Sequence, residues 1–253
     1  MNPHDFKYFD VEQLPGGQLT PELASELAHM RYVGRTWTTH GPWSDNAAAI
    51  AGRVTQLALD ETLSRSRPGM VLTGGREESE AITARLQSYL PELVIRNLTV
   101  DDRLSPGRSK ACRDAVTEEA AVRVITYRMF REARQSFWGA GGPVVFLEQA
   151  DRLADGGQDY EFTKQLAHKA GSVHLFTTVG LLNNPGATFH LGSLLRLPHF
   201  PRSLQRFKTA YVKSIGHGLN EVMAWRHSAM SELAELLDLH HHERAERDVP
   251  LND

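Results

Sequence analysis

Two carboxylates and one amide stand where they could hold a cation and activate a water molecule. They are Glu148, Gln149 and Asp151, directly after the apolar run of residues 143–147. A short apolar run bounded by Gly and Pro is typical of a buried strand in a parallel sheet, and ligands of such sheets bind at the carboxyl ends of the strands. Glu148 could ligate a cation, whereas the amide of Gln149 cannot accept a proton from water. We therefore take these three residues as catalytic candidates. Alternatively, the strand end is simply polar and Asp151 caps the next turn.

A second candidate site lies between a predicted strand and a predicted helix, residues 32–39 and 47–63. Strand, glycine-containing loop and helix follow in the order that a phosphate-binding loop requires. The connecting residues 40–46 include one glycine and no lysine, although a working loop of this kind needs several glycines and a lysine that reaches the terminal phosphates. The segment therefore matches a phosphate-binding loop by position and not by motif.

The candidate cofactor-binding residues come from this loop and from one later turn. Asp45 would repel a phosphate by several kcal/mol at an effective dielectric constant of about 20, and an ordinary turn in which it caps the helix is the alternative. Asn183, beyond the predicted strand of residues 173–178, could sense a bound nucleotide, but Asn-Asn-Pro-Gly is also a common turn. Together, the candidates are Gly41, Ser44, Asp45, Asn46 and Asn183.

A local basic cluster is the best candidate for contact with nucleic acid. It consists of Arg103, Arg108, Lys110 and Arg113, in and beside a polar loop. Such side chains can neutralise phosphates, although a run of this kind is more often a solvated surface. The chain as a whole gives no such signal, because 28 basic and 31 acidic residues leave a net charge of −3.

The composition excludes several kinds of site. The lone cysteine, Cys112, rules out an internal disulfide and a cysteine-based metal cluster. The adjacent histidines at 240–242 do not converge on one ion, so we expect no metal site and place them in a solvated tail. No apolar run approaches the roughly 20 residues of a membrane span, and no apolar signal segment begins the sequence. We expect a cytoplasmic protein without membrane contact.

Alternating strand and helix patterns predict an α/β fold. The expected architecture is a P-loop NTPase-like, three-layer core with a parallel sheet of about five strands, helices on both faces, and a small C-terminal helical lid. Residues 110–137 are expected to be helical in two pieces, and residues 194–197 to form a last short strand. The predicted parts are an N-terminal arm and helix (1–30), the core (31–200), the lid (201–239) and a polar tail (240–253).

The order of these parts resembles a P-loop NTPase of the AAA+ type. The resemblance is strongest over residues 127–153, where a helix runs into an apolar strand that ends in an acidic residue, x, Ala, Asp, x, Leu. Within that superfamily, residues 69–90 and 162–176 are similar to transposon-associated regulators of the TniB/ExeA-like group. Residues 125–127 and 181–184 also resemble motifs of chromatin-remodeller-type helicases, which offers a second parentage.

The resemblance implies a site for ATP and magnesium, but its key parts differ in this sequence. Ser44–Asn46 stand where Gly-Lys-Thr is expected, and Gln149 replaces the glutamate that polarises water. We therefore predict a degenerate domain that needs no cofactor and does not hydrolyse ATP. It would act as a structural or regulatory subunit, with a protein partner or as an oligomer, in a DNA transaction. The alternatives are a divergent ATPase that uses ATP and Mg²⁺ through Glu148, and a helicase-like fragment that binds nucleic acid near Arg108.

Overall fold

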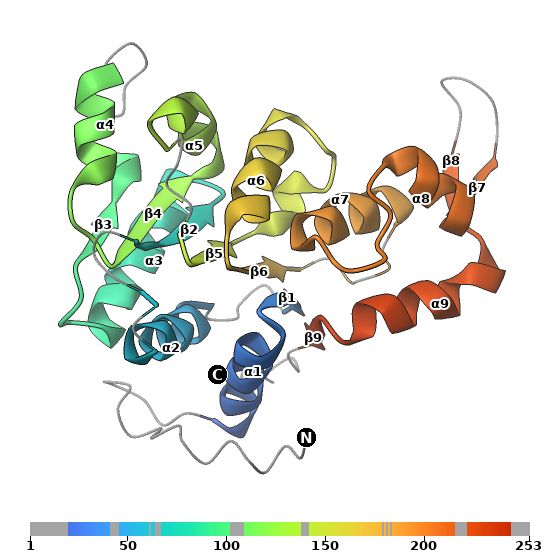
Figure 1. The fold of residues 1–253 in the computed structure, drawn as a ribbon, viewed down its shortest axis with the longest axis horizontal. Coiled ribbons are helices and arrows are strands. Elements are labelled where there is room, and N and C mark those ends of the chain that lie inside the picture. The colour runs from blue at the N-terminus through green and yellow to red at the C-terminus, as the bar shows by residue number, and fades with distance from the viewer. Residues whose placement is uncertain are drawn as a thin grey trace, which may run out of the picture.

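The chain folds into three layers, a parallel β-sheet with helices on both faces (Figure 1). The structure is a computed structural model. It describes residues 20–40, 46–60, 62–63, 67–101, 109–137, 142–178, 180, 182, 184–215 and 222–243. The predicted α/β fold class is confirmed.

Seven parallel strands form the central sheet, where the sequence predicted about five. Their order across the sheet is β3-β4-β2-β5-β6-β1-β9, and neighbouring strands all pair in parallel. The strands are β1 (Arg35–Thr39), β2 (Gly69–Thr73), β3 (Ile95–Asn97), β4 (Val122–Thr126), β5 (Val144–Leu147), β6 (Ser172–Thr177) and β9 (His241–Glu243). Because β5 lies between β2 and β6, the residues that follow it stand at the middle of the sheet's carboxyl edge.

The helices divide between the two faces (Figure 1). One face carries α1 (Pro21–Val33), α2 (Asn46–Leu59) and α3 (Arg76–Tyr89), and the other carries α4 (Ser109–Thr117), α5 (Tyr127–Ala133), α6 (Gln158–Lys169) and α7 (Pro185–Leu195). Short 3₁₀ turns follow β3, α5 and β5, namely η3 (Leu98–Val100), η5 (Arg134–Phe137) and η6 (Ala150–Leu153). In β5, Val144 and Phe146 pack toward α2, whereas Val145 and Leu147 pack toward α5 and α6. A strand covered on both faces favours apolar side chains at every position, which explains the unbroken apolar run of β5.

Residues 122–126 form a strand, so the prediction of a helix there is wrong. β4 pairs with β2 and β3, and all five of its residues are buried. The apolar spacing of Val122 and Ile125 fits a helix, but four of these five residues are β-branched, which favours a strand. Helix α5 begins only after Thr126, whose side-chain oxygen accepts a hydrogen bond from the Met129 backbone N–H (3.3 Å).

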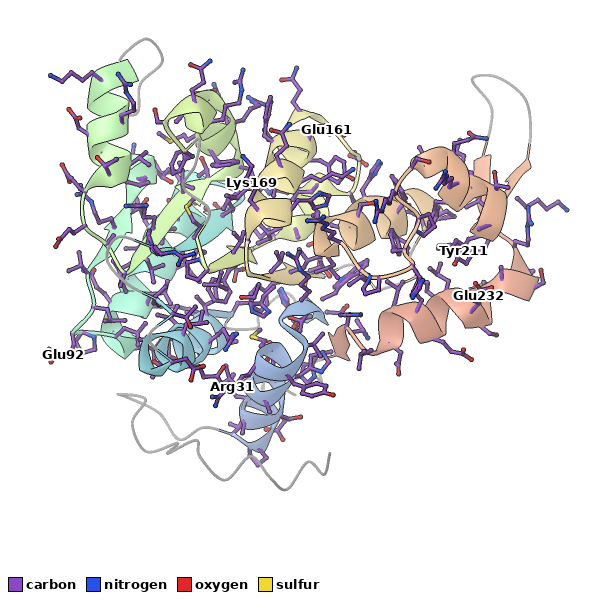
Figure 2. All side chains as sticks on the ribbon, viewed as in Figure 1. Arg31, Glu92, Glu161, Lys169, Tyr211 and Glu232 are labelled. Carbon is purple, nitrogen blue, oxygen red and sulfur yellow. The ribbon has the colours of Figure 1, made fainter. Side chains whose placement is uncertain are left out.

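The C-terminal part is not the all-helical lid that the sequence suggested. Between α8 (Leu204–Tyr211) and α9 (His227–Asp238), strands β7 (Val212–Ile215) and β8 (Val222–Trp225) pair antiparallel as a separate small sheet. Figure 2 shows Tyr211 beside Glu232 of α9. Burial raises the pKa of Tyr211, and the charge and hydrogen bond of Glu232 act in the same direction. Residues 194–197, expected as a strand, instead end α7 and lead into a turn.

Residues 241–243, expected in a polar tail, instead form β9 at the edge of the sheet. They pair in parallel with β1. The backbone N–H of Trp37 donates to His240 O (2.7 Å), and His240 Nδ1 lies 2.8 Å from Arg35 O. The C-terminal segment is therefore tied to the first strand of the core by backbone hydrogen bonds.

Candidate functional site

Polar side chains from several elements meet where β5 ends. Glu148, the first residue after β5, is only 8% exposed. Its backbone N–H donates to Leu72 O (2.8 Å), and its carbonyl accepts the hydroxyl of Tyr127 (2.7 Å). Both backbone groups of Glu148 are thus fixed, which sets the direction of its side chain.

The hydroxyl of Tyr127 keeps its proton and so remains a hydrogen-bond donor to the backbone carbonyl of Glu148. Burial raises the pKa of Tyr127 well above its usual range, and the negative charges of Glu148 and Asp151 raise it further. The phenol therefore stays protonated far above neutral pH, because burial and nearby negative charge both disfavour the phenolate.

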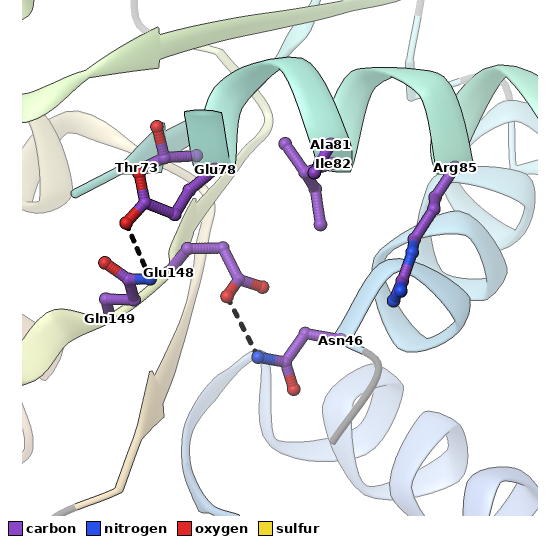
Figure 3. A pocket seen from close by; sticks show the side chains of 8 residues that line it. All are labelled: Asn46, Thr73, Glu78, Ala81, Ile82, Arg85, Glu148 and Gln149. Carbon is purple, nitrogen blue, oxygen red and sulfur yellow. Dashed lines mark hydrogen bonds between the residues drawn. The ribbon is translucent and has the colours of Figure 1, made fainter. Parts of the chain in front are cut away.

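Asn46, a predicted cofactor-binding residue, lies against Glu148. It is the first residue of α2 and is buried. Its amide Nδ2 donates to Glu148 Oε2 over 2.9 Å and lies 3.2 Å from His40 Nε2 (Figure 3). The structure thus joins one candidate from each of the two predicted sites. Their contact is a direct hydrogen bond within the chain. In a P-loop NTPase, the phosphate-binding loop and the metal-binding carboxylate would face each other at this place.

Gln149 points away from Asn46, toward α3 (Figure 3). Its backbone has φ of 49°, in the left-handed region that side chains other than glycine adopt at an energetic cost. The amide Nε2 lies 3.5 Å from Glu78 Oε1. The side chains of Gln149 and Glu148 therefore contact different residues, although the two are adjacent in the chain.

Asp151 links η6 to the next strand of the sheet. Both of its carboxylate oxygens accept the backbone N–H of Thr178, at 3.0 and 3.1 Å. Thr178 follows directly after β6, so the carboxylate caps the end of that strand. The interpretation of Asp151 as a capping residue fits this geometry, although the capped N–H belongs to Thr178, directly after β6, and not to the turn after β5.

A cavity of about 170 Å³ lies between α2, α3 and the end of β5. Its lining combines two carboxylates, one guanidinium, two amides and one hydroxyl with two apolar side chains. Its lining residues are Asn46, Thr73, Glu78, Ala81, Ile82, Arg85, Glu148 and Gln149. Within the described parts of the chain, no group of three or more His, Cys, Asp or Glu side chains could hold a metal ion.

Several predicted site residues fall outside the described residues, namely Gly41, Ser44, Asp45, Arg103, Arg108 and Asn183. The two described members of the basic cluster, Lys110 and Arg113, lie on α4 and belong to no part of the cavity. Helix α4 stands at one end of the molecule, and α8 with β7 and β8 stands at the other (Figure 1).

The comparisons with known proteins identify the fold. No protein-family model matches the sequence, and no curated protein sequence matches it. Two structures of the SWI2/SNF2 ATPase core from Sulfolobus solfataricus are similar. The one in complex with dsDNA has a TM-score of 0.75 at 15% identity and covers 93% of this chain and 46% of that chain. The one of the core domain has a TM-score of 0.70 at 13% identity, covering 93% and 45%.

This likeness confirms a P-loop NTPase-like fold, and at such low identity it concerns the fold alone. The chain spans about half the length of both structures. Both structures fit the resemblance to chromatin-remodeller-type helicases. They do not point specifically to AAA+ proteins or to the TniB/ExeA-like group. None of the helices among the described residues is long and apolar enough to cross a membrane.

The sequence interpretation missed a local charge asymmetry. The 59 residues from 162 to 220 contain seven Lys or Arg and no Asp or Glu, in a chain whose net charge is −3. Counting charges in a sliding window reveals this segment, whereas the total conceals it. It also missed Glu78 and Tyr127, because their contacts with Gln149 and Glu148 arise only from the order of strands in the sheet, and it missed His40, which contacts Asn46 only six residues further along the chain.

Proposed function

We propose that this protein is a helicase-type α/β domain that binds duplex DNA through the phosphate backbone and does not hydrolyse ATP on its own. The observation that carries the proposal is the acid-free segment of residues 162–220. A polyanion gains affinity from clustered cations by releasing its condensed counterions, so a local surplus of positive charge matters more than the total.

The exposed cations of this segment lie mainly on and around the small C-terminal sheet. Arg202 and Arg206 lie just before and on α8, and Lys213 lies on β7. All three are exposed, and among the described residues none of them has an ion pair. By contrast, the exposed Arg76 and Arg128 are engaged by Glu80 and Glu132 one helical turn away. The unpaired cations are the ones available to phosphates.

Duplex DNA is the favoured polyanion because of the fold. One of the two similar structures is a SWI2/SNF2 ATPase core in complex with dsDNA. Since the present chain spans about half of that protein, we assign to it the binding of DNA and not the activity of the whole.

The geometry at the end of β5 supports the lack of hydrolysis. P-loop NTPases hold Mg²⁺ between a loop hydroxyl and a strand-end carboxylate, with a lysine on the phosphates. Here the strand-end carboxylate, Glu148, accepts a hydrogen bond from the Asn46 amide. No lysine occurs between Arg35 and Arg53, and Gln149 cannot act as a base. We further propose that the domain acts as a regulatory or structural subunit beside a protein partner. We also propose that it is related to remodeller-type helicases and not to AAA+ proteins.

The DNA-binding part is tested by fluorescence anisotropy with a labelled duplex over a range of salt concentrations. Arg206→Ala/Lys213→Ala should weaken binding and reduce the slope of log K against log salt by about two, one for each lost phosphate contact. Arg76→Ala/Arg128→Ala is the matched control, since it removes two exposed but paired cations, and it should leave the slope unchanged. If instead Lys110→Ala/Arg113→Ala produces the effect, α4 is the contact surface. If the parent protein does not bind the duplex, the proposed function is wrong.

The proposed absence of ATP hydrolysis is tested by adding Mg–ATP. We expect no turnover and no significant change of Tm on addition of the nucleotide. An increase of Tm by several degrees would indicate tight binding to the folded state. Turnover that disappears in Glu148→Ala would establish the divergent-ATPase alternative.

A further inference from the structure

Gln149 belongs to a contact between two loops at the carboxyl edge of the sheet. We call the four residues Gly74, Glu78, Gln149 and Arg152 the Gln149 cluster. Gly74 lies in the connection of β2 to α3 and Glu78 in the first turn of α3, whereas Gln149 lies between β5 and η6 and Arg152 in η6 itself. Gln149 Nε2 lies 3.5 Å from Glu78 Oε1, and the guanidinium of Arg152 lies 3.8 Å from the same oxygen.

Gly74 also takes part in this contact between the two segments. Arg152 donates to Gly74 O over 3.4 Å. A Cβ atom at Gly74 would overlap with Gln149 Oε1 and with Arg152 Nε, so both side chains pack directly on this Cα. The glycine is therefore required by the side chains above it, because its own φ is not in the left-handed region.

The backbone of Gln149 is the third observation. A left-handed residue other than glycine persists only where its surroundings hold it. Here the side chain is held by Gly74 and Glu78, and the 3₁₀ turn that it precedes is anchored through Asp151 to Thr178. The conformation thus aims the amide at Glu78 on α3.

We propose that Gln149 is a positioning residue that fixes the loop between β2 and α3 to the end of β5, at the place where P-loop NTPases need a free carboxylate. A glutamate here would face Glu78 at about the distance of the present hydrogen bond, and two carboxylates at this separation repel each other. Restoring a glutamate at this position therefore opens the loop contact and does not create a catalytic base. This proposal depends neither on DNA binding nor on the absence of ATP hydrolysis.

Native-state hydrogen exchange of the first turn of α3 tests it, because that turn includes the hydrogen bond from Ser79 N to Gly75 O (3.1 Å). Gln149→Glu should speed exchange in this turn about tenfold, since Arg152 offsets only part of the repulsion. Gln149→Glu/Glu78→Gln exchanges the two roles, so that the new amide donates to the new carboxylate. It should return exchange to within about twofold of the parent.

Glu80 provides the matched control. It lies on the same helix, is exposed and pairs with Arg76. Gln149→Glu/Glu80→Gln removes the same charge but no partner of residue 149, so exchange should stay as fast as in Gln149→Glu.

A milder variant keeps the test valid if Gln149→Glu does not fold. Gln149→Gly removes the side chain, and glycine adopts the left-handed φ without strain. It should speed exchange in the first turn of α3 severalfold while leaving the last turn unchanged. Unchanged exchange in Gln149→Gly, or equal exchange in the two double variants, would overturn the proposal.

Discussion

Asn46→Ala should destabilise the domain, because it removes a buried hydrogen bond to a carboxylate. Asn46 Nδ2 and Glu148 Oε2 are 2.9 Å apart, and both residues are buried. A hydrogen bond to a charged group contributes roughly 1.5–3 kcal/mol to the free energy of unfolding. For domains of about 150–250 residues, each kcal/mol changes Tm by about 2–4 °C, so Tm should fall by roughly 3–12 °C. Differential scanning fluorimetry measures this change, and urea unfolding checks it.

A double-mutant cycle separates this hydrogen bond from the other consequences of the substitution. In a Glu148→Gln background the acceptor at position 148 is neutral, so Asn46→Ala should lower the free energy of unfolding by about half as much as in the parent. Equal losses in both backgrounds would show that the charge of Glu148 contributes nothing to the contact. An unchanged Tm for Asn46→Ala in the parent would refute the reasoning altogether.

Three further predictions concern the core. Burial lowers the pKa of His174 well below 6.5, and Arg53 lowers it further, so the unfolded chain binds a proton below pH 6.5 that the folded protein does not. The free energy of unfolding should then fall by up to about 1.4 kcal/mol per pH unit as the pH drops below 6.5. His174→Gln should reduce this slope in urea unfolding and the exposed His227→Gln should not; equal slopes would contradict the assignment. Tyr127→Phe should lower the free energy of unfolding by about 1 kcal/mol through loss of its bond to Glu148 O, and an unchanged urea midpoint would exclude that contribution. Arg35 donates to Ala167 O, Ala170 O and Leu195 O, so Arg35→Lys, which cannot reach all three, should lower Tm despite keeping the charge. A Tm equal to that of the parent would refute this.

Element type was predictable where a single local pattern dominated. The unbroken apolar run before Glu148 indicated a buried strand, and β5 is one. The same lack of alternation misled the assignment at Val122, because a strand covered on both faces shows no period of two and its apolar residues can also fit a helix. Strand β9 was not predictable, since its three residues are polar and acquire their conformation by pairing with β1.

The partners at the candidate site depend on strand order, which local patterns do not contain. Asn46 and Glu148 are 102 residues apart in the chain and meet because both lie at the carboxyl edge of one parallel sheet. The sequence indicated each of them as a candidate separately. It gave no sign that Glu148 would face the Asn46 amide while Gln149 turned to Glu78, because that division follows from the left-handed backbone at Gln149.

The net charge of −3 was the wrong quantity for judging DNA binding. At physiological ionic strength, charges beyond about 8 Å are largely screened, so a phosphate responds to nearby side chains and hardly to the total. Around α8 and β7 the nearby cations are Arg202, Arg206 and Lys213, which come from a segment without a single acidic residue, and one carboxylate, Glu232 of α9, lies beside Tyr211. The acidic residues that cancel them in the total lie elsewhere in the sequence, for example Glu77, Glu78 and Glu80 on α3. A chain can therefore be acidic overall and still carry several unpaired cations on one part of its surface, and these three outnumber the single carboxylate of Glu232 beside Tyr211.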